Sequence, residues 1–104
     1  MPAWMKFIYR RRIDRYVQFA ERIFGIKQEG RNPEEIALEG INRFEAFLRR
    51  LEVPTRLSAF DISETEIDGM VEDVARISFN ATGTLASRPP VGREGVRAVY
   101  HEAL

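Results

Sequence analysis

Residues 32–51 of this chain read NPEEIALEGINRFEAFLRRL and contain a strong helix start. Asn32 supplies an N-cap side chain, Pro33 suits the first helical turn, and the two glutamates that follow favour the positive end of a helix. Gly40 lies inside the helical pattern, where glycine costs about 1 kcal/mol against alanine, so we expect close packing against another helix there. A helix over residues 33–52 is predicted from apolar residues at helical spacing: Ile36, Leu38, Ile41, Phe44, Phe47, Leu48 and Leu51.

The segments on either side predict further helices. Residues 3–24 carry one apolar stripe, and Gly25 is placed to end that helix with a positive φ angle. Ser63-Glu64-Thr65-Glu66 matches a capping box before a third apolar pattern, and the composition of residues 78–92 predicts a turn-rich loop. We therefore expect an all-α fold, as a single helical domain or fragment over residues 1–104, with about four helices at residues 3–24, 33–52, 64–77 and 93–103.

The composition excludes several classes of function. Sixteen basic side chains balance sixteen acidic ones, so no overall charge favours nucleic acid or an anionic membrane as partner. The absence of cysteine excludes disulfides, thiolate zinc sites and iron–sulfur clusters. The longest apolar run is far shorter than the roughly 20 residues that cross a bilayer, so we expect a cytoplasmic protein that binds neither membrane nor nucleic acid.

Two groups of residues are candidates for metal binding. His101 is the only histidine, no metal-ligand motif accompanies it, and a cationic side chain is favoured near the end of the last helix in any case. Asp68 and Glu72 stand one helical turn apart, as a carboxylate metal site would require. Helix capping and first-turn charge already account for the acidic set, so we favour a solvated face made of Asp61, Glu64, Glu66, Asp68, Glu72 and Asp73.

A third candidate is a set of basic and aromatic residues that could bind a phosphate: Arg10, Arg11, Arg12 and Arg15, interleaved with Tyr9 and Tyr16. Asp14 and Glu21 share the same helix, and no nucleic-acid-binding motif follows. We therefore favour a solvated or interdomain helix face. The glycines form no phosphate-binding motif, so no nucleotide site is expected.

The chain contains, in this order, Met1-Pro2-Ala3-Trp4-Met5-Lys6, the stretch from Phe19 to Ile26, Ile36-Ala37-Leu38-Glu39-Gly40-Ile41 with Phe44 and Phe47, Val53-Pro54-Thr55-Arg56-Leu57-Ser58, and the stretch from Val96 to Leu104. Their order and spacing resemble the iron-dependent alcohol dehydrogenases, in particular the butanol-dehydrogenase-like branch. In that family the first stretch follows the last metal-binding histidine, so the resemblance points to the C-terminal helical segment of such an enzyme. Gly92-Arg93-Glu94-Gly95 departs from the pattern and gives a weaker cap, which predicts a loosely held tail.

The resemblance implies a metal, iron(II) or zinc, held by one aspartate and three histidines, which polarises the alcohol or aldehyde oxygen while hydride passes to or from NAD(P). All four ligands would precede Met1, so no catalytic, cofactor-binding or metal-binding residue is assigned here, and Trp4 is kept only as a residue near the metal. The chain would support the metal and substrate cleft and would be inactive alone. Its partners would be the N-terminal and metal-binding parts of the enzyme, and we also expect self-association through exposed apolar faces. The alternative is a free-standing helical protein-interaction module derived from that family.

Overall fold

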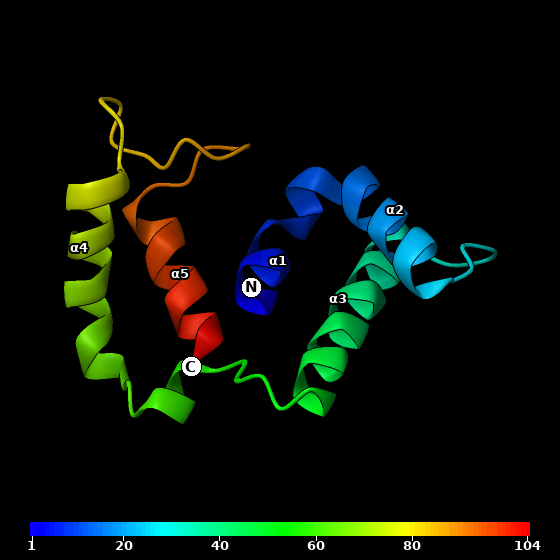
Figure 1. Ribbon diagram of the computed structural model, residues 1–104. Coiled ribbons are helices and arrows are strands. Elements are labelled where there is room, and N and C mark those ends of the chain that lie inside the picture. The colour runs from blue at the N-terminus through cyan, green and yellow to red at the C-terminus, as the bar shows by residue number, and fades with distance from the viewer. The chain divides into compact units, whose positions relative to one another are not determined.

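The computed structural model describes all 104 residues and is built from helices (Figure 1). The α-helices are α1 (Pro2–Ile8), α2 (Ile13–Phe24), α3 (Pro33–Arg50), α4 (Ile67–Ser78) and α5 (Arg93–Ala103), and the 3₁₀ helices are η1 (Tyr9–Arg12), η2 (Leu57–Phe60) and η3 (Glu64–Glu66). The only β pairing is an isolated antiparallel bridge between Leu85 and Val91. The expected all-α fold is confirmed.

The chain forms two compact units, Met1–Thr55 and Arg56–Leu104. The first unit contains α1, η1, α2 and α3, and the second contains η2, η3, α4 and α5. No helix combines enough length with enough apolar character to span a bilayer. The expected single domain over residues 1–104 stays a prediction.

In the first unit, α3 is the central helix, because both α1 and α2 pack on it. Its start follows the sequence prediction: the Asn32 side chain accepts a hydrogen bond from the backbone N–H of Glu34 at 2.8 Å, and Pro33 occupies the first turn. Two apolar clusters form the core, one with the buried residues Met5, Tyr9, Ala37 and Ile41 and the other with Ala20, Ile26 and Ile36.

The expected continuous helix over residues 3–24 is wrong, because η1 interrupts it and Arg12 leaves the helical region at φ −136° and ψ 45°. Packing explains the break. Met5 joins Ala37 in one core cluster, while Ala20 lies against Gly40 one turn further along α3. A straight helix would hold Met5 and Ala20 about 22 Å apart, since each residue adds about 1.5 Å. The chain must therefore bend for both segments to pack on the same part of α3.

Gly40 allows α2 and α3 to approach closely, as the sequence predicts. A Cβ atom built at Gly40 would lie 2.6 Å from the Cβ of Ala20 and 3.0 Å from its Cα. Neither atom is the flexible end of a long side chain, so nothing local could move aside. The end of α2 also follows the prediction, since Gly25 adopts φ 64°.

In the second unit, α4 and α5 run side by side (Figure 1). Ile67 and Val71 of α4 are buried, as is Val96 of α5. At the far end of α5, Arg56 Nη1 donates to the backbone oxygen of Glu102 at 3.3 Å, and Ser58 Oγ donates to that of Leu104 at 3.0 Å. These bonds satisfy carbonyl groups that a helix end leaves without partners, so Arg56 and Ser58, at the start of η2, fix the end of α5.

The expected capping box at residues 63–66 does not form. The Ser63 hydroxyl lies 2.9 Å from the Thr65 hydroxyl and makes no bond to a backbone N–H of the helix start. Glu64–Glu66 form the 3₁₀ helix η3, so α4 begins only at Ile67. The competing hydroxyl contact and the tighter first turn replace the cap that the sequence pattern predicts.

The turn-rich loop expected over residues 78–92 is organised around Asn80. Its side-chain oxygen accepts hydrogen bonds from the backbone N–H groups of Thr82 at 3.0 Å and Thr84 at 3.2 Å. Further along, the backbone N–H of Leu85 donates to Val91 at 2.8 Å, and the Val91 side chain is buried. The loop before α5 is thus closed by specific hydrogen bonds, although Gly92 caps α5 with no side-chain bond.

Candidate functional site

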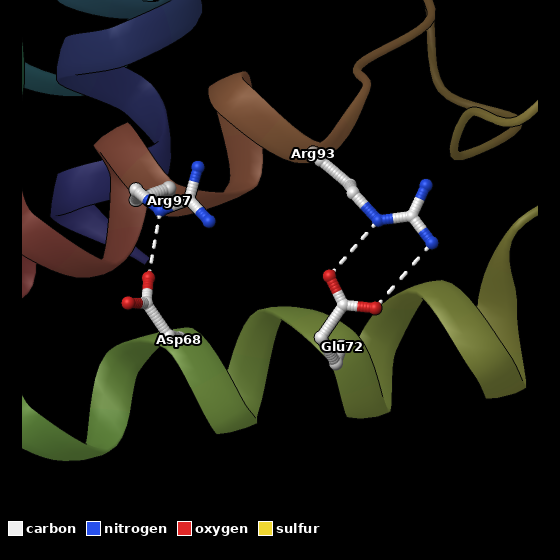
Figure 2. Close-up of polar contacts among 4 residues, drawn as sticks. All are labelled: Asp68, Glu72, Arg93 and Arg97. Atoms are coloured by element: carbon white, nitrogen blue, oxygen red, sulfur yellow. Dashed lines mark hydrogen bonds and ion pairs between the residues drawn. The ribbon is translucent and has the colours of Figure 1, made fainter.

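The two acidic residues that stand one turn apart on α4 are paired with arginines of α5. Figure 2 shows Asp68 and Glu72 directed toward Arg97 and Arg93. Arg97 Nε donates to Asp68 Oδ1 at 2.9 Å, and Arg93 donates to both carboxylate oxygens of Glu72, from Nε at 3.0 Å and from Nη2 at 3.4 Å. Two-point arginine–carboxylate pairs of this kind fix relative orientation. The carboxylates therefore join two helices.

We expect the Glu72–Arg93 pair to couple the stability of α4 and α5 weakly. Both side chains are more than half exposed, so the coupling should be about 0.2–1 kcal/mol and should shrink in high salt. A double-mutant cycle with Glu72→Gln and Arg93→Gln, measured by urea unfolding, checks this. Glu94→Gln is the control, because Glu94 is exposed on α5 and has no ion-pair partner. A double-mutant effect equal to the sum of the two single effects would contradict the coupling.

The remaining metal candidates are not brought together. His101 is exposed in the last turn of α5, where its backbone oxygen accepts from the N–H of Leu104 at 3.2 Å. Asp73 pairs with Arg76 on its own helix at 3.1 Å. No three histidine, aspartate or glutamate side chains form a group that could hold a metal ion. With one histidine and no such group, this chain does not itself supply the aspartate and three histidines that the resemblance implies.

The arginines of η1 are held by aromatic rings. The guanidinium carbon of Arg10 lies 5.1 Å from the centre of the Tyr9 ring, and that of Arg11 lies 5.3 Å from the centre of the Phe7 ring. Arg10 also approaches Glu34 of α3 at 3.5 Å, in an exposed pair. Such stacking limits the freedom of each guanidinium while leaving its donors open to water.

Further aromatic and basic residues lie near these arginines in the sequence. The rings of Trp4 and Phe7 are 6.3 Å apart and tilted by 48°, and Trp4 is half-buried. Arg15 is exposed on α2. Burial raises the pKa of Tyr16, against the opposing charge of Arg12, so its hydroxyl stays neutral at ordinary pH. None of these side chains lies in a group of metal donors.

One buried charge was not expected from the sequence. Glu45 of α3 is buried, and its carboxylate pairs with Lys6 of α1 at 3.5 Å and with Arg49 at 2.9 Å. The four-residue spacing of Glu45 and Arg49 was visible in the sequence as an ordinary surface pair. The pair with Lys6 could not be predicted from the sequence, because only the packing of α1 on α3 brings Lys6 to Glu45.

A second ion pair closes the loop before α3. Arg31 Nη1 donates to Glu39 Oε2 at 3.0 Å, and Arg43 lies 3.8 Å from the same oxygen. The hydrogen bond from Arg31 is the main reason that the pKa of Glu39 is lowered. The carboxylate therefore stays ionised, and keeps both partners, to lower pH than a free glutamate.

These features define an all-α packing module in which charged residues join helices. A sequence model described as "Fe-containing alcohol dehydrogenase family, C-terminal" matches residues 1–104. The chain belongs to this family, and it corresponds to the C-terminal part. The resemblance in the sequence, from Met1-Pro2-Ala3-Trp4-Met5-Lys6 onward, is confirmed.

Individual relatives agree with this assignment. Probable NADH-dependent butanol dehydrogenase 1 of Bacillus subtilis (strain 168) is 31% identical over 103 residues, which cover 99% of this chain and 25% of the relative. Probable NADH-dependent butanol dehydrogenase 2 of the same organism is 34% identical over 74 residues, which cover 71% of this chain and 19% of the relative. The chain thus spans a quarter or less of the length of these curated relatives.

A solved structure shares the fold. The crystal structure of NADH-dependent butanol dehydrogenase A from Thermotoga maritima matches with a TM-score of 0.84 and 33% sequence identity. The match covers 98% of this chain and 26% of that one. The helical arrangement described above is therefore that of one segment of a butanol dehydrogenase.

Proposed function

We propose that this chain is the C-terminal helical portion of a metal-dependent, NAD(P)-linked alcohol dehydrogenase and that it supports the metal and substrate cleft of that enzyme. The observation that carries the proposal is the match of the whole chain, residues 1–104, to the C-terminal part of the family. The helices supply positioning, while metal ligands and the nucleotide site come from the remainder of the enzyme. On its own the chain has no alcohol dehydrogenase activity.

Exposed apolar residues support a role as part of a larger assembly. Phe47 lies in the last turn of α3, Leu51 directly follows the helix and Val53 comes two residues later, and all three are exposed. Apolar side chains gathered at one helix end favour contact with another protein surface. In the proposed enzyme this surface is covered by the N-terminal and metal-binding parts.

A chimera tests this proposal. The corresponding C-terminal quarter of the Thermotoga maritima enzyme is replaced by residues 1–104, and NADH oxidation is followed with butyraldehyde and iron(II). We expect the chimera to keep activity within about a hundredfold of the parent, since small misplacements of a catalytic site cost about that much. The isolated chain is expected to show no turnover under the same conditions.

Matched variants separate a folding defect from a failed function. Gly69→Ala in the chimera changes an open position of α4 and should preserve activity, whereas Gly40→Val disturbs the contact of α2 with α3 and should reduce it. Turnover by the isolated chain would overturn the proposed dependence on the remainder. A chimera that is folded by circular dichroism and binds iron, yet lacks activity, would overturn the supporting role.

The second candidate is a free-standing helical interaction module derived from the same family. The exposed side chains of Phe47, Leu51 and Val53 favour it to the same extent, because a binding module also needs an uncovered apolar surface. The chimera distinguishes the two functions. A folded but inactive chimera would favour the interaction module.

A further inference from the structure

The zero net charge of the chain conceals opposite charges on its two units. Residues 1–55 contain eleven basic and eight acidic side chains, and residues 56–104 contain five basic and eight acidic side chains. The first unit is therefore positive and the second is negative by the same amount. Opposite charge on separate surfaces favours association between molecules even when each molecule is neutral overall.

Three of the unpaired acidic side chains of the second unit lie together in the segment from Phe60 to Glu66. Asp61, Glu64 and Glu66 are exposed and have no ion-pair partner, whereas Asp68 and Glu72 are already paired with arginines of α5. We call Asp61, Glu64 and Glu66, together with Phe60, the acidic surface. It also offers an apolar anchor, because the Phe60 side chain is 63% exposed.

A group of exposed basic side chains of the first unit lies on η1 and the start of α2. Arg11 and Arg15 are exposed and have no acidic partner, and Arg10 has only a weak exposed contact with Glu34. Arg11 is stacked on the half-buried ring of Phe7. We call Arg10, Arg11 and Arg15, together with Phe7, the basic surface. Each of the two surfaces therefore combines charged side chains of one sign with one aromatic ring.

We propose that the basic surface of one copy of this chain binds the acidic surface of a second copy. Carboxylates of the segment from Phe60 to Glu66 meet Arg11 and Arg15, while the exposed Phe60 ring packs beside Phe7. Aromatic and arginine side chains are the usual anchors of protein interfaces. Because the two surfaces differ, the contact is head-to-tail and can add further copies. This inference does not depend on the dehydrogenase function.

Sedimentation velocity of the 104-residue chain tests the contact. At about 20 mM salt the average mass should rise with protein concentration, and at about 500 mM salt the chain should return to the monomer, because salt screens exposed pairs. Arg11→Glu with Arg15→Glu, and separately Glu64→Lys with Glu66→Lys, should each weaken association about tenfold or more. An equimolar mixture of these two variants should associate again, since one then carries only acidic surfaces and the other only basic ones.

Controls make the result specific to these surfaces. Lys27→Glu with Arg50→Glu changes the net charge as much as the arginine variant does, at exposed positions without acidic partners, and should leave association unchanged. Circular dichroism confirms that each variant is folded. A monomer at every concentration would overturn the proposal, as would association that persists at high salt in both charge variants. Compaction at low salt that is independent of concentration would also overturn it.

Discussion

Replacing Gly40 by valine is expected to destabilise the first unit by about 1–3 kcal/mol, the range found when side chains are forced into a packed core. The Cβ atom alone would lie 2.6 Å from the Cβ of Ala20, so α2 and α3 would have to move apart. For a domain of this size the melting temperature should fall by about 4–8 °C for each kcal/mol. Thermal unfolding followed by the fluorescence of Trp4, the only tryptophan, measures the effect within this unit.

Gly40→Ala separates packing from helix propensity. Alanine favours a helix interior by about 1 kcal/mol over glycine, so propensity alone would raise stability. The contact with Ala20 opposes this gain, and we expect a net loss that is smaller than for valine. Gly69→Ala is the matched control, because nothing lies within 4 Å of the added Cβ on α4. It should raise stability in circular dichroism melts, since only propensity acts there.

The other residue of the close contact, Ala20, can be changed as well. Ala20→Gly in the Gly40→Ala background takes away the atom at 2.6 Å, so the two changes should be less damaging together than the sum of their separate effects. A coupling of about 0.5–3 kcal/mol is expected for residues in direct contact. Additive effects, or a Gly40→Val variant as stable as the parent, would contradict the close approach of α2 and α3.

Gly40 also shows which parts of the fold are readable from sequence. Its contact was predictable because a glycine inside a strong helix pattern needs a compensating reason, and close packing is the usual one. The Asn32 cap and the Gly25 helix end were predictable for a different reason, because each depends only on local backbone chemistry. The cap and the helix end need no knowledge of distant residues, whereas the sequence predicts the close approach at Gly40 without naming its partner Ala20.

The bend at η1 and the buried charge of Glu45 were not readable in this way. Both follow from the packing of α1 on α3, which places Met5 and Lys6 against a helix that begins about thirty residues later. Periodicity describes one helix at a time, so it joins α1 and α2 into one stripe and assigns Glu45 to the surface. The ion pairs between α4 and α5 were also not predictable from periodicity. Asp68 meets Arg97, and Glu72 meets Arg93, only after the two helices pack.

Ile41→Ala is expected to have the largest effect on stability, a loss of about 2–5 kcal/mol, as for other buried isoleucine truncations. Ile41 has no exposed surface and packs in the cluster that joins α3 to Met5 of α1 and Tyr9 of η1. Its removal leaves a cavity where three helical segments meet, so the neighbouring side chains cannot close the space without strain. Because whole domains are stable by only about 5–15 kcal/mol, the variant should be close to unfolding at physiological temperature.

Ile23→Ala is the control variant, because it makes the same truncation at an exposed position. Ile23 is the same residue type in the same unit, but 65% of its surface is exposed on α2. Its truncation should change stability by no more than about 0.5 kcal/mol. Urea unfolding followed by Trp4 fluorescence compares the two variants, and the difference between them isolates the core contribution of Ile41. Similar losses for both variants would mean that Ile23 is covered in solution, and the self-association measured by sedimentation would then be the first contact to examine at that position.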